Sequence, residues 1–218
     1  MTDSLRSNVD VWKELQEKEY FGTDRNVYSG TDNEIRVPDD RLVERFRPLT
    51  PDTVMAVIGS GYGREATIFG KRVKRVYGID VSDHVLSKAV EYTRRNGVNN
   101  FVPVVFETYK TAIPDEALDL VYSIVVMQHL TRDLVRDYFR SLARKLKPGG
   151  AFVVQFYTSP IADAAHDIGP ERVEQSVAWS RAQLQELCTQ SGLVERAIET
   201  MELTPVIHWS FVHFERPR

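Results

Sequence analysis

The stretch VMAVIGSGYGREA, from Val54 to Ala66, sets a run of apolar residues directly before three glycines at alternate positions. Apolar residues bounded by a glycine-rich turn are typical of a short buried strand. Gly59, Gly61 and Gly63 permit positive φ angles and let a ligand lie against the backbone. In an open parallel sheet, the first strand-to-helix turn lies at the edge where ligands bind. The stretch therefore predicts a strand, a ligand-binding turn and a helix.

The alternation of strand and helix continues along the chain. Further buried strands are expected at residues 73–79, 101–106, 118–126 and 151–157. Ser82 is placed to cap a helix that ends at Asn96-Gly97, and Thr131 to cap one that ends at Lys147–Gly150. This alternation predicts an α/β fold with a parallel sheet covered on both faces. A last helix at 180–192 precedes two strand-like runs joined by a short linker, which predicts an antiparallel final strand.

An acidic residue ends the second expected strand. Asp80 follows Gly63 by seventeen positions, in VYGIDVS, and is well placed to accept hydrogen bonds from both hydroxyls of a ribose. The glycine spacing differs from the dinucleotide fingerprint, because Arg64 stands where that fingerprint requires its third glycine. The pattern indicates a nucleoside site and argues against a dehydrogenase of the same winding.

Composition excludes several other classes. The chain has 218 residues, 42% of them hydrophobic, which fits one domain or a domain with a cap. A formal charge of -3 argues against a nucleic-acid partner. The single cysteine, Cys188, and the absence of clustered histidines argue against a disulfide or a metal site. A polar N-terminus without a long apolar run leads us to expect a cytoplasmic protein without a membrane partner.

Four segments in this order resemble the class I S-adenosylmethionine-dependent methyltransferases, over roughly residues 50 to 215. They are GSGYG, GID, ETYKTAIPDEALDLVYSIVVMQHL and LARKLKPGGAFVV. The resemblance implies a doubly wound, Rossmann-like sheet of seven mostly parallel strands with an antiparallel last strand. It also implies S-adenosylmethionine as cofactor and methyl transfer to an oxygen or nitrogen of a small-molecule acceptor.

The resemblance assigns cofactor-binding roles to particular residues. It places Gly59, Gly61 and Gly63 against the methionine part of the cofactor and Asp80 on its ribose. Glu107 and Thr108 align with the pair that meets the adenine, and Ser123 to Val125 close the pocket. Val57 departs from the pattern, because many members carry an acidic residue there. The segment YSIV departs from Asn-Pro-Pro-aromatic, which argues against a nucleic-acid base amine or a glutamine amide as acceptor.

The catalytic residues are less defined than the cofactor site. A hydroxyl acceptor would be helped by a general base, whereas an amine needs only its neutral form in a dry pocket. His129, after the fourth strand, and His166, in the irregular stretch before the last helix, are the candidate bases. His208 and His213 lie on the last strand and are expected to pack or to face solvent.

Residues 1–50 lie outside the resemblance, and residues 51–218 are expected to form the methyltransferase domain. Trp12, Leu15, Tyr20 and Phe21 are spaced like an amphipathic helix followed by an aromatic turn. Such segments commonly form a lid over the cofactor in this family, and Tyr20, Tyr28 and Arg36 are the candidate lid residues. A helix packed on the sheet without ligand contact is the alternative. Two other functions stay open, a non-catalytic S-adenosylmethionine-binding module and methylation of a protein side chain; the oligomeric state is not indicated.

Overall fold

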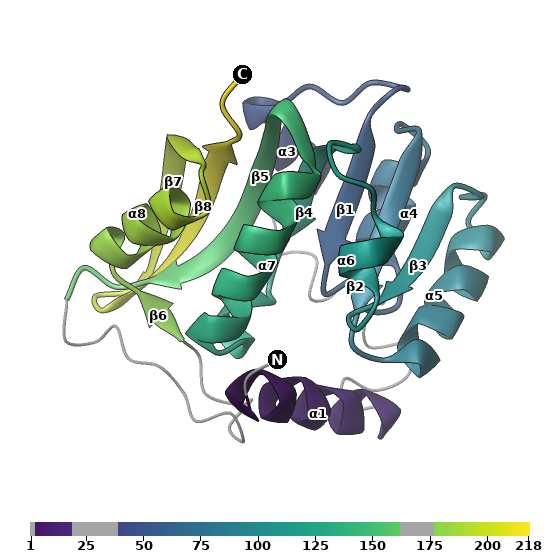
Figure 1. The fold of residues 1–218 in the computed structure, drawn as a ribbon, viewed down its shortest axis with the longest axis horizontal. Coiled ribbons are helices and arrows are strands. Elements are labelled where there is room, and N and C mark those ends of the chain that lie inside the picture. Colours follow the sequence, from purple (N-terminus) through teal and green to yellow (C-terminus); the bar gives the residue numbers. More distant parts are fainter. Residues whose placement is uncertain (1–2, 19–38, 162–176) are drawn as a thin grey trace. The chain divides into compact units, whose positions relative to one another are not determined.

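The computed structural model describes residues 3–18, 39–161 and 177–218, and its contacts group the chain into two compact units. The glycine-loop unit is Trp12–Ile113, and the hairpin unit is Met1–Val11 with Pro114–Arg218. Figure 1 shows the ribbon of both units, coloured along the chain. Helix α1 (Asp3–Glu17) has its first residues in the hairpin unit and its last residues in the glycine-loop unit.

The glycine-loop unit is built on three parallel strands. They are β1 (Val54–Ile58), β2 (Arg75–Asp80) and β3 (Phe101–Val105), and β2 pairs with both of the others. The helices of this unit are α3 (Asp39–Phe46), α4 (Arg64–Gly70), α5 (Asp83–Arg95) and the short α6 (Tyr109–Ala112). Figure 1 shows α5 beside β3. The expected order of strand, glycine turn, helix and strand is confirmed here.

Helix α5 forms where its cap and apolar spacing predict. The side chain of Ser82 accepts a hydrogen bond from the Val85 amide at 3.4 Å, which satisfies one of the free amides of the first turn. The buried side chains recur at helical spacing, as Val85, Leu86, Ala89 and Thr93. The helix ends at Asn96 and Gly97, and Gly97 has a φ of 76°.

The hairpin unit contains the remaining strands. Strand β4 (Leu118–Ser123) is parallel to β5 (Leu146–Thr158), while β8 (Ile207–Glu215) is antiparallel to both β5 and β7 (Val194–Thr204). The expected antiparallel last strand is therefore confirmed. The two-residue β6 (Ala178–Trp179) pairs with the end of β5, so the described residues hold eight strands where seven were expected. Two helices, α7 (Arg132–Lys145) and α8 (Arg181–Gln190), and the 3-10 turn η1 (Met127–His129) complete the unit.

Aromatic packing joins α7 to the strands of this unit. The ring of Phe139 stacks on Phe152 with centroids 4.5 Å apart, and it contacts Phe156 and Phe214 at 5.9 and 6.1 Å. All four side chains are fully buried. Burying one such ring contributes about 1.5–3 kcal/mol, and the ring pairs add about 0.5–1.5 kcal/mol each. This cluster holds the antiparallel β8 and the parallel β5 against the same helix.

Two segments differ from the prediction. The segment KPGG does not end a helix before a strand; it lies within β5, where Leu146 and Ala151 oppose Leu118 and Leu120. Gly149 there has a φ of 79°, and its amide bonds the Arg216 carbonyl at 2.8 Å, so the extra residues form a bulge. Strand β4 ends at Ser123, three residues before the expected end, because Val125 adopts a φ of 58°.

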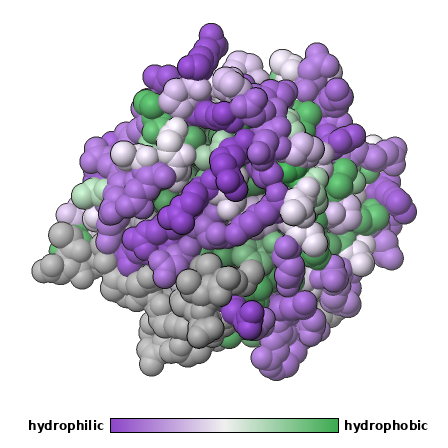
Figure 2. Space-filling view, in the orientation of Figure 1, coloured by the Kyte–Doolittle hydropathy of each residue, from purple (hydrophilic) through white to green (hydrophobic). Residues whose placement is uncertain are grey.

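None of the helices in the described ranges is long and apolar enough to cross a membrane. On the face that Figure 2 shows, hydrophilic side chains predominate, and apolar side chains lie in smaller groups between them. The exposed large apolar residues include Met201, Leu203 and Val206 at the turn between β7 and β8.

Gly63 and Gly97 offer a matched test of packing in the glycine-loop unit. Both have a left-handed φ, 86° and 76°, but a Cβ on Gly63 would lie 3.0 Å from Thr93 Cγ2, whereas one on Gly97 meets nothing within 4 Å. Gly63→Ala should therefore lower the free energy of unfolding by about 1–3 kcal/mol more than Gly97→Ala, as overpacking adds to backbone strain. Urea unfolding measures both; equal losses would show that α5 does not constrain Gly63.

Candidate functional site

The glycine loop turns sharply at the end of β1. Gly59, Gly61 and Gly63 all have left-handed φ angles, 66°, 50° and 86°, which a residue with a side chain rarely adopts. The Ser60 amide donates to the Ile79 carbonyl at 3.0 Å, and the Gly63 amide donates to the Ser60 carbonyl at 3.0 Å. The loop is thus fixed to the neighbouring strand β2 and to itself, and it needs glycine at each of these turns.

Asp80 holds the loop through its side chain. One carboxylate oxygen, Oδ2, accepts from the Gly61 amide at 2.8 Å, and Oδ1 accepts from the Val81 and Ser82 amides at 2.8 and 3.4 Å. Asp80 is only 5% exposed. Burial raises the pKa of this carboxyl above its usual range, while the Gly61, Ser82 and Val81 amides act to lower it. A carboxylate has about four lone-pair sites, so three amide bonds leave capacity for a ligand hydroxyl.

The glycines of the site serve different purposes. A Cβ on Gly61 would stand in open space, so the bareness of that residue is not required by protein packing. Gly63, in contrast, lies against α5, since a Cβ there would meet Thr93 and Ala89 at 3.0 and 3.2 Å. Open space at Gly61 fits a backbone surface left clear for a ligand, whereas the bareness of Gly63 is explained by helix packing.

Gly78 is a residue of the site that the sequence analysis did not identify. It lies in the middle of β2, where a Cβ would approach Ser60 Oγ to 2.6 Å and Phe101 Cε2 to 2.3 Å. Gly78 therefore lets the glycine loop and the first residue of β3 lie over the strand. A glycine inside a strand often marks such a close approach, and this signal was available in the sequence VYGID.

Glu107 and Thr108 follow the end of β3, beside Asp80. The Phe106 amide donates to the Asp80 carbonyl at 2.8 Å, so Glu107 is the first residue beyond the paired strands β2 and β3. Thr108 donates from its amide and its hydroxyl to the Val105 carbonyl, at 3.0 and 3.2 Å. The Glu107 side chain is 49% exposed and lies 3.9 Å from Lys13 Nζ of α1. The structure thus brings the predicted ribose and adenine residues together at one strand edge.

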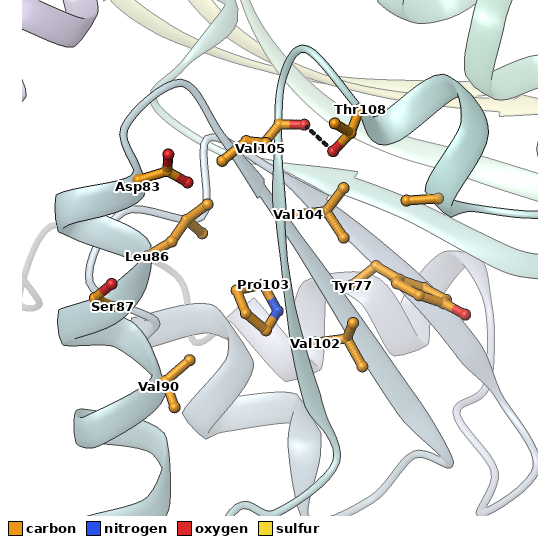
Figure 3. Close-up of a pocket in the computed structure, with 11 residues that line it drawn as sticks. Tyr77, Asp83, Leu86, Ser87, Val90, Val102, Pro103, Val104, Val105 and Thr108 are labelled. Carbon is orange, nitrogen blue, oxygen red and sulfur yellow. Dashed lines mark hydrogen bonds between the residues drawn. The ribbon is translucent and has the colours of Figure 1, made fainter.

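A groove of about 310 Å³ runs along β3 in the same unit, and Figure 3 shows its lining. Asp83, Leu86, Ser87 and Val90 of α5 face it, with Tyr77 of β2. Its lining includes Thr108 but neither Asp80 nor Gly61. The groove is therefore distinct from the loop that Asp80 holds, and Thr108 is the one predicted adenine residue in its lining.

Val57 is buried in β1, with 1% exposure, and supplies no charge at the position where the family pattern has an acid. The first acidic residue after the loop is Glu65, in the first turn of α4. Its carboxylate accepts from Arg64 Nε at 2.9 Å, and the Arg64 and Glu65 side chains are 12% and 10% exposed. A partly buried ion pair thus follows the glycine loop directly, and the sequence analysis gave it no role.

The other predicted site residues belong to the hairpin unit. Ser123, fully buried, ends β4, and Val125 is half-buried in the loop that follows. His129 ends the turn η1, is half-buried, and donates from its amide to the Val126 carbonyl at 2.9 Å. His208 and His213 lie on β8 as expected, and His213 is buried.

Several predicted residues lie outside the described ranges. They are Tyr20 and Phe21 of the expected aromatic turn, Tyr28, Arg36 and His166. Within the described ranges, no three His, Cys, Asp or Glu side chains are grouped so that they could hold a metal ion.

Part of the chain is similar to known methyltransferases. Residues 56–154 match a family described as a methyltransferase domain. Thiocyanate methyltransferase 1 of Brassica oleracea is 30% identical over 114 residues, which are 52% of this chain and 49% of that protein. O-methyltransferase 3 of Dictyostelium discoideum is 29% identical over 166 residues, 72% of this chain and 38% of that protein. The chain therefore spans about half or less of these curated relatives.

A solved structure agrees with the fold. Phosphoethanolamine N-methyltransferase 2 of Haemonchus contortus, in complex with S-adenosyl-L-methionine, has a TM-score of 0.67 at 17% identity, covering 96% of this chain and 57% of that chain. The parallel strands, the glycine loop and the antiparallel last strand define a Rossmann-like α/β domain. The match of residues 56–154 to a methyltransferase domain agrees with the resemblance that the sequence motifs gave, and the solved structure of similar fold is a complex with S-adenosyl-L-methionine.

Gly61→Ala tests whether the open space at the loop belongs to the cofactor. The variant and its control, Gly97→Ala, both put a Cβ into open space at a left-handed residue, so their losses of stability should be similar. Only Gly61→Ala should weaken binding of S-adenosylhomocysteine, by about 10-fold or more, because its Cβ occupies space that the ligand needs. Calorimetry measures both affinities. Wild-type affinity in folded Gly61→Ala would mean that the loop is only a turn.

The raised pKa of Asp80 predicts a pH dependence of cofactor binding. Ribose hydroxyls donate to an ionised carboxylate more strongly than to a protonated one, so affinity should fall as pH drops through the pKa of Asp80. Because burial raises this pKa, the fall should begin above the usual carboxyl range near about 3.9. For the stability of the free protein the sign is opposite. The raised pKa of Asp80 stabilises the fold at low pH, and this stabilisation is lost as pH rises through the pKa of the folded state.

Calorimetry with S-adenosylhomocysteine from neutral to acidic pH measures this dependence, with Asp80→Asn as the control. The variant should bind more weakly at neutral pH and show a flatter profile, since it has no carboxyl group at this position. Identical profiles in the two proteins would assign the titration to another group.

Proposed function

We propose that this chain transfers a methyl group from S-adenosylmethionine to an oxygen or nitrogen of a small-molecule acceptor. One observation carries the proposal. The carboxylate of Asp80 bonds the Gly61 amide at 2.8 Å, beside an open backbone surface, within the region that matches a methyltransferase domain. The names of the relatives support small acceptors, since they include a thiocyanate methyltransferase, an O-methyltransferase and a phosphoethanolamine N-methyltransferase.

The cofactor roles follow from the strand ends. Asp80 would accept from the ribose hydroxyls with the lone pairs that its three amide bonds leave free. The backbone at Gly59 and Gly61 would lie against the methionine part, and Gly63 would support the loop through its packing on α5. Glu107 and Thr108 would border the adenine. Ser123 and Val125 would close the pocket.

Bound S-adenosylmethionine supplies an electrophilic methyl group on a sulfonium, so the protein needs mainly to align the acceptor and exclude water. For a hydroxyl acceptor, the imidazole of His129 would take the proton that the oxygen loses as it is methylated. Its position at the end of η1, after the loop that contains Val125, supports this role. His166 is the second candidate base. For an amine acceptor, a neutral nitrogen in a dry pocket needs no such base.

We further propose that residues 1–50 act as a lid on the domain formed by residues 51–218. Helix α1 is longer than the expected helix and has Asn8, Val9 and Trp12 buried. In the hairpin unit, Asn8 Oδ1 accepts from the Thr131 amide at 3.4 Å, two residues after His129. In the glycine-loop unit, Lys13 lies 3.9 Å from Glu107. Both contacts involve residues at or next to predicted site positions. They therefore support a lid rather than a helix that packs on the sheet without ligand contact.

His129→Asn tests the base and His208→Asn is its control. His208 is half-buried on β8 and has no predicted role in the reaction. With a hydroxyl acceptor, His129→Asn should lower kcat by about 100-fold or more and leave the affinity for S-adenosylhomocysteine within about threefold of wild type. His208→Asn should change neither quantity more than about threefold.

The measurement is transfer of labelled methyl groups from S-adenosylmethionine to a panel of small hydroxyl and amine acceptors. A loss below about threefold in His129→Asn would remove His129 as base and favour an amine acceptor or His166. Tight cofactor binding with no methyl release to any acceptor would instead favour a non-catalytic binding module. Transfer of the labelled methyl group to added protein alone would favour a protein side chain as acceptor.

A further inference from the structure

The loop after β4 contains a residue in an unfavourable backbone conformation. Val125 has a φ of 58°, in the left-handed region that β-branched residues almost never occupy. Such a conformation is energetically unfavourable and persists only where the surroundings enforce it. Val125 is half-buried, so packing of its side chain is not enough to account for this cost. Another group must hold its backbone.

Gln155 is the group that holds it. The Val125 amide donates to Gln155 Oε1 at 2.8 Å. Gln155 follows Val154, which pairs with Ser123 at the end of β4, so its side chain continues where the strand pairing stops. The hydrogen bond therefore replaces the ladder that β4 would have made had it continued through Val125.

Gln155 is itself an unfavourable residue for the stability of the fold at this position. It is fully buried within the apolar run AFVVQFY, and its amide nitrogen, Nε2, has no hydrogen-bond partner among the described residues. An unsatisfied buried donor destabilises the fold, and an apolar side chain would avoid this loss. Since the Val125 amide requires an acceptor, the oxygen of Gln155 must face it, and the nitrogen is left unpaired. Glutamine at position 155 thus holds the Val125 backbone at the expense of core stability.

The loop beyond Val125 is fixed at its far end. The His129 amide donates to the Val126 carbonyl at 2.9 Å, and the Val177 amide donates to the Gln128 carbonyl at 2.7 Å. Gln128 is 1% exposed. From Val126 onward the chain is therefore held by its own turn and by the segment before β6. The direction in which Val125 turns the chain then decides where His129 lies relative to the end of β4.

We propose that Gln155 is a positioning residue that clamps Val125 in its left-handed conformation and so fixes the loop from Ser123 to His129. The inference rests on the proposed function, because Ser123 and Val125 are the predicted cofactor-closing residues and His129 the predicted base. Gln155 acts on the reaction through the Val125 backbone. Without the clamp, the loop relaxes toward an ordinary negative φ, and the cofactor-closing edge is lost.

The test is a double-mutant cycle between Gln155→Met and Val125→Gly. Methionine has a similar length but offers no acceptor, whereas glycine adopts a positive φ without strain and needs no clamp. In the chain with Val125, Gln155→Met should weaken S-adenosylhomocysteine binding by about 10-fold. In the Val125→Gly background, whatever affinity that variant has, adding Gln155→Met should change it by less than about threefold.

Two controls separate positioning from core damage. Val154→Ala disturbs another fully buried residue of β5, and glycine at position 125 should give it no rescue. Gln155→Glu keeps an oxygen that accepts from the Val125 amide and should retain more affinity than Gln155→Met. If Gln155→Met fails to fold alone, the comparison of Val125→Gly with the double variant still decides, since the double variant is expected to fold and bind like Val125→Gly.

Equal losses from Gln155→Met in both backgrounds, or an unfolded double variant, would overturn the proposal. Cofactor binding is read by calorimetry and needs no acceptor, so this result is independent of methyl transfer. A chain that shows the predicted coupling but transfers no methyl group would retain the clamp and lose the proposed function. A chain that transfers methyl groups without coupling would retain the function and lose the clamp.

Discussion

The hydrogen bond from the Gly61 amide to the Asp80 carboxylate is the interaction on which the site depends. It joins the loop after β1 to the last residue of β2, and the Asp80 carbonyl in turn accepts from Phe106 at the end of β3. Three strand ends are thereby held together by one buried residue. Because each carboxylate oxygen can accept more than one hydrogen bond, the residue that organises the loop also keeps lone pairs for the ribose hydroxyls that we propose it binds.

Several site residues have a backbone conformation or an environment that is locally unfavourable. Gly61 is left-handed with open space beside it, Val125 is left-handed despite its β-branched side chain, and Gln155 is a buried amide in an apolar strand. Away from the site, caps, apolar spacing and ring packing agree with one another, as in α5 and around Phe139. Such conflicts between local preference and structure are expected where a protein binds or reacts.

The parts of the fold set by local signals were predictable. Ser82 and Thr131 cap the helices that their positions indicated, and the C-terminal hairpin has the expected antiparallel strand. The bulge at KPGG was not predictable from periodicity, because it depends on a contact with Arg216, distant in the sequence. The early end of β4 likewise depends on Gln155, thirty residues further along the chain.

The site was predictable to the extent that its residues lie at strand ends. Asp80, Glu107 and the glycines were placed correctly at one edge, because parallel strands bring their carboxyl ends together. The division of labour among the glycines was not, since Gly61 and Gly63 look alike in sequence and differ only in what a Cβ would meet. Gly78 and Gln155 carried visible signals, a glycine inside a strand and an amide inside an apolar run, whose meaning required their partners.

The most direct test of the central claim is a crystal structure of the chain with S-adenosylhomocysteine bound. The account predicts that the ribose hydroxyls lie within hydrogen-bond distance of the Asp80 carboxylate while the Gly61 amide keeps its bond to the same carboxylate. A ribose held by other residues, or a loop in which Gly61 has left Asp80, would contradict it.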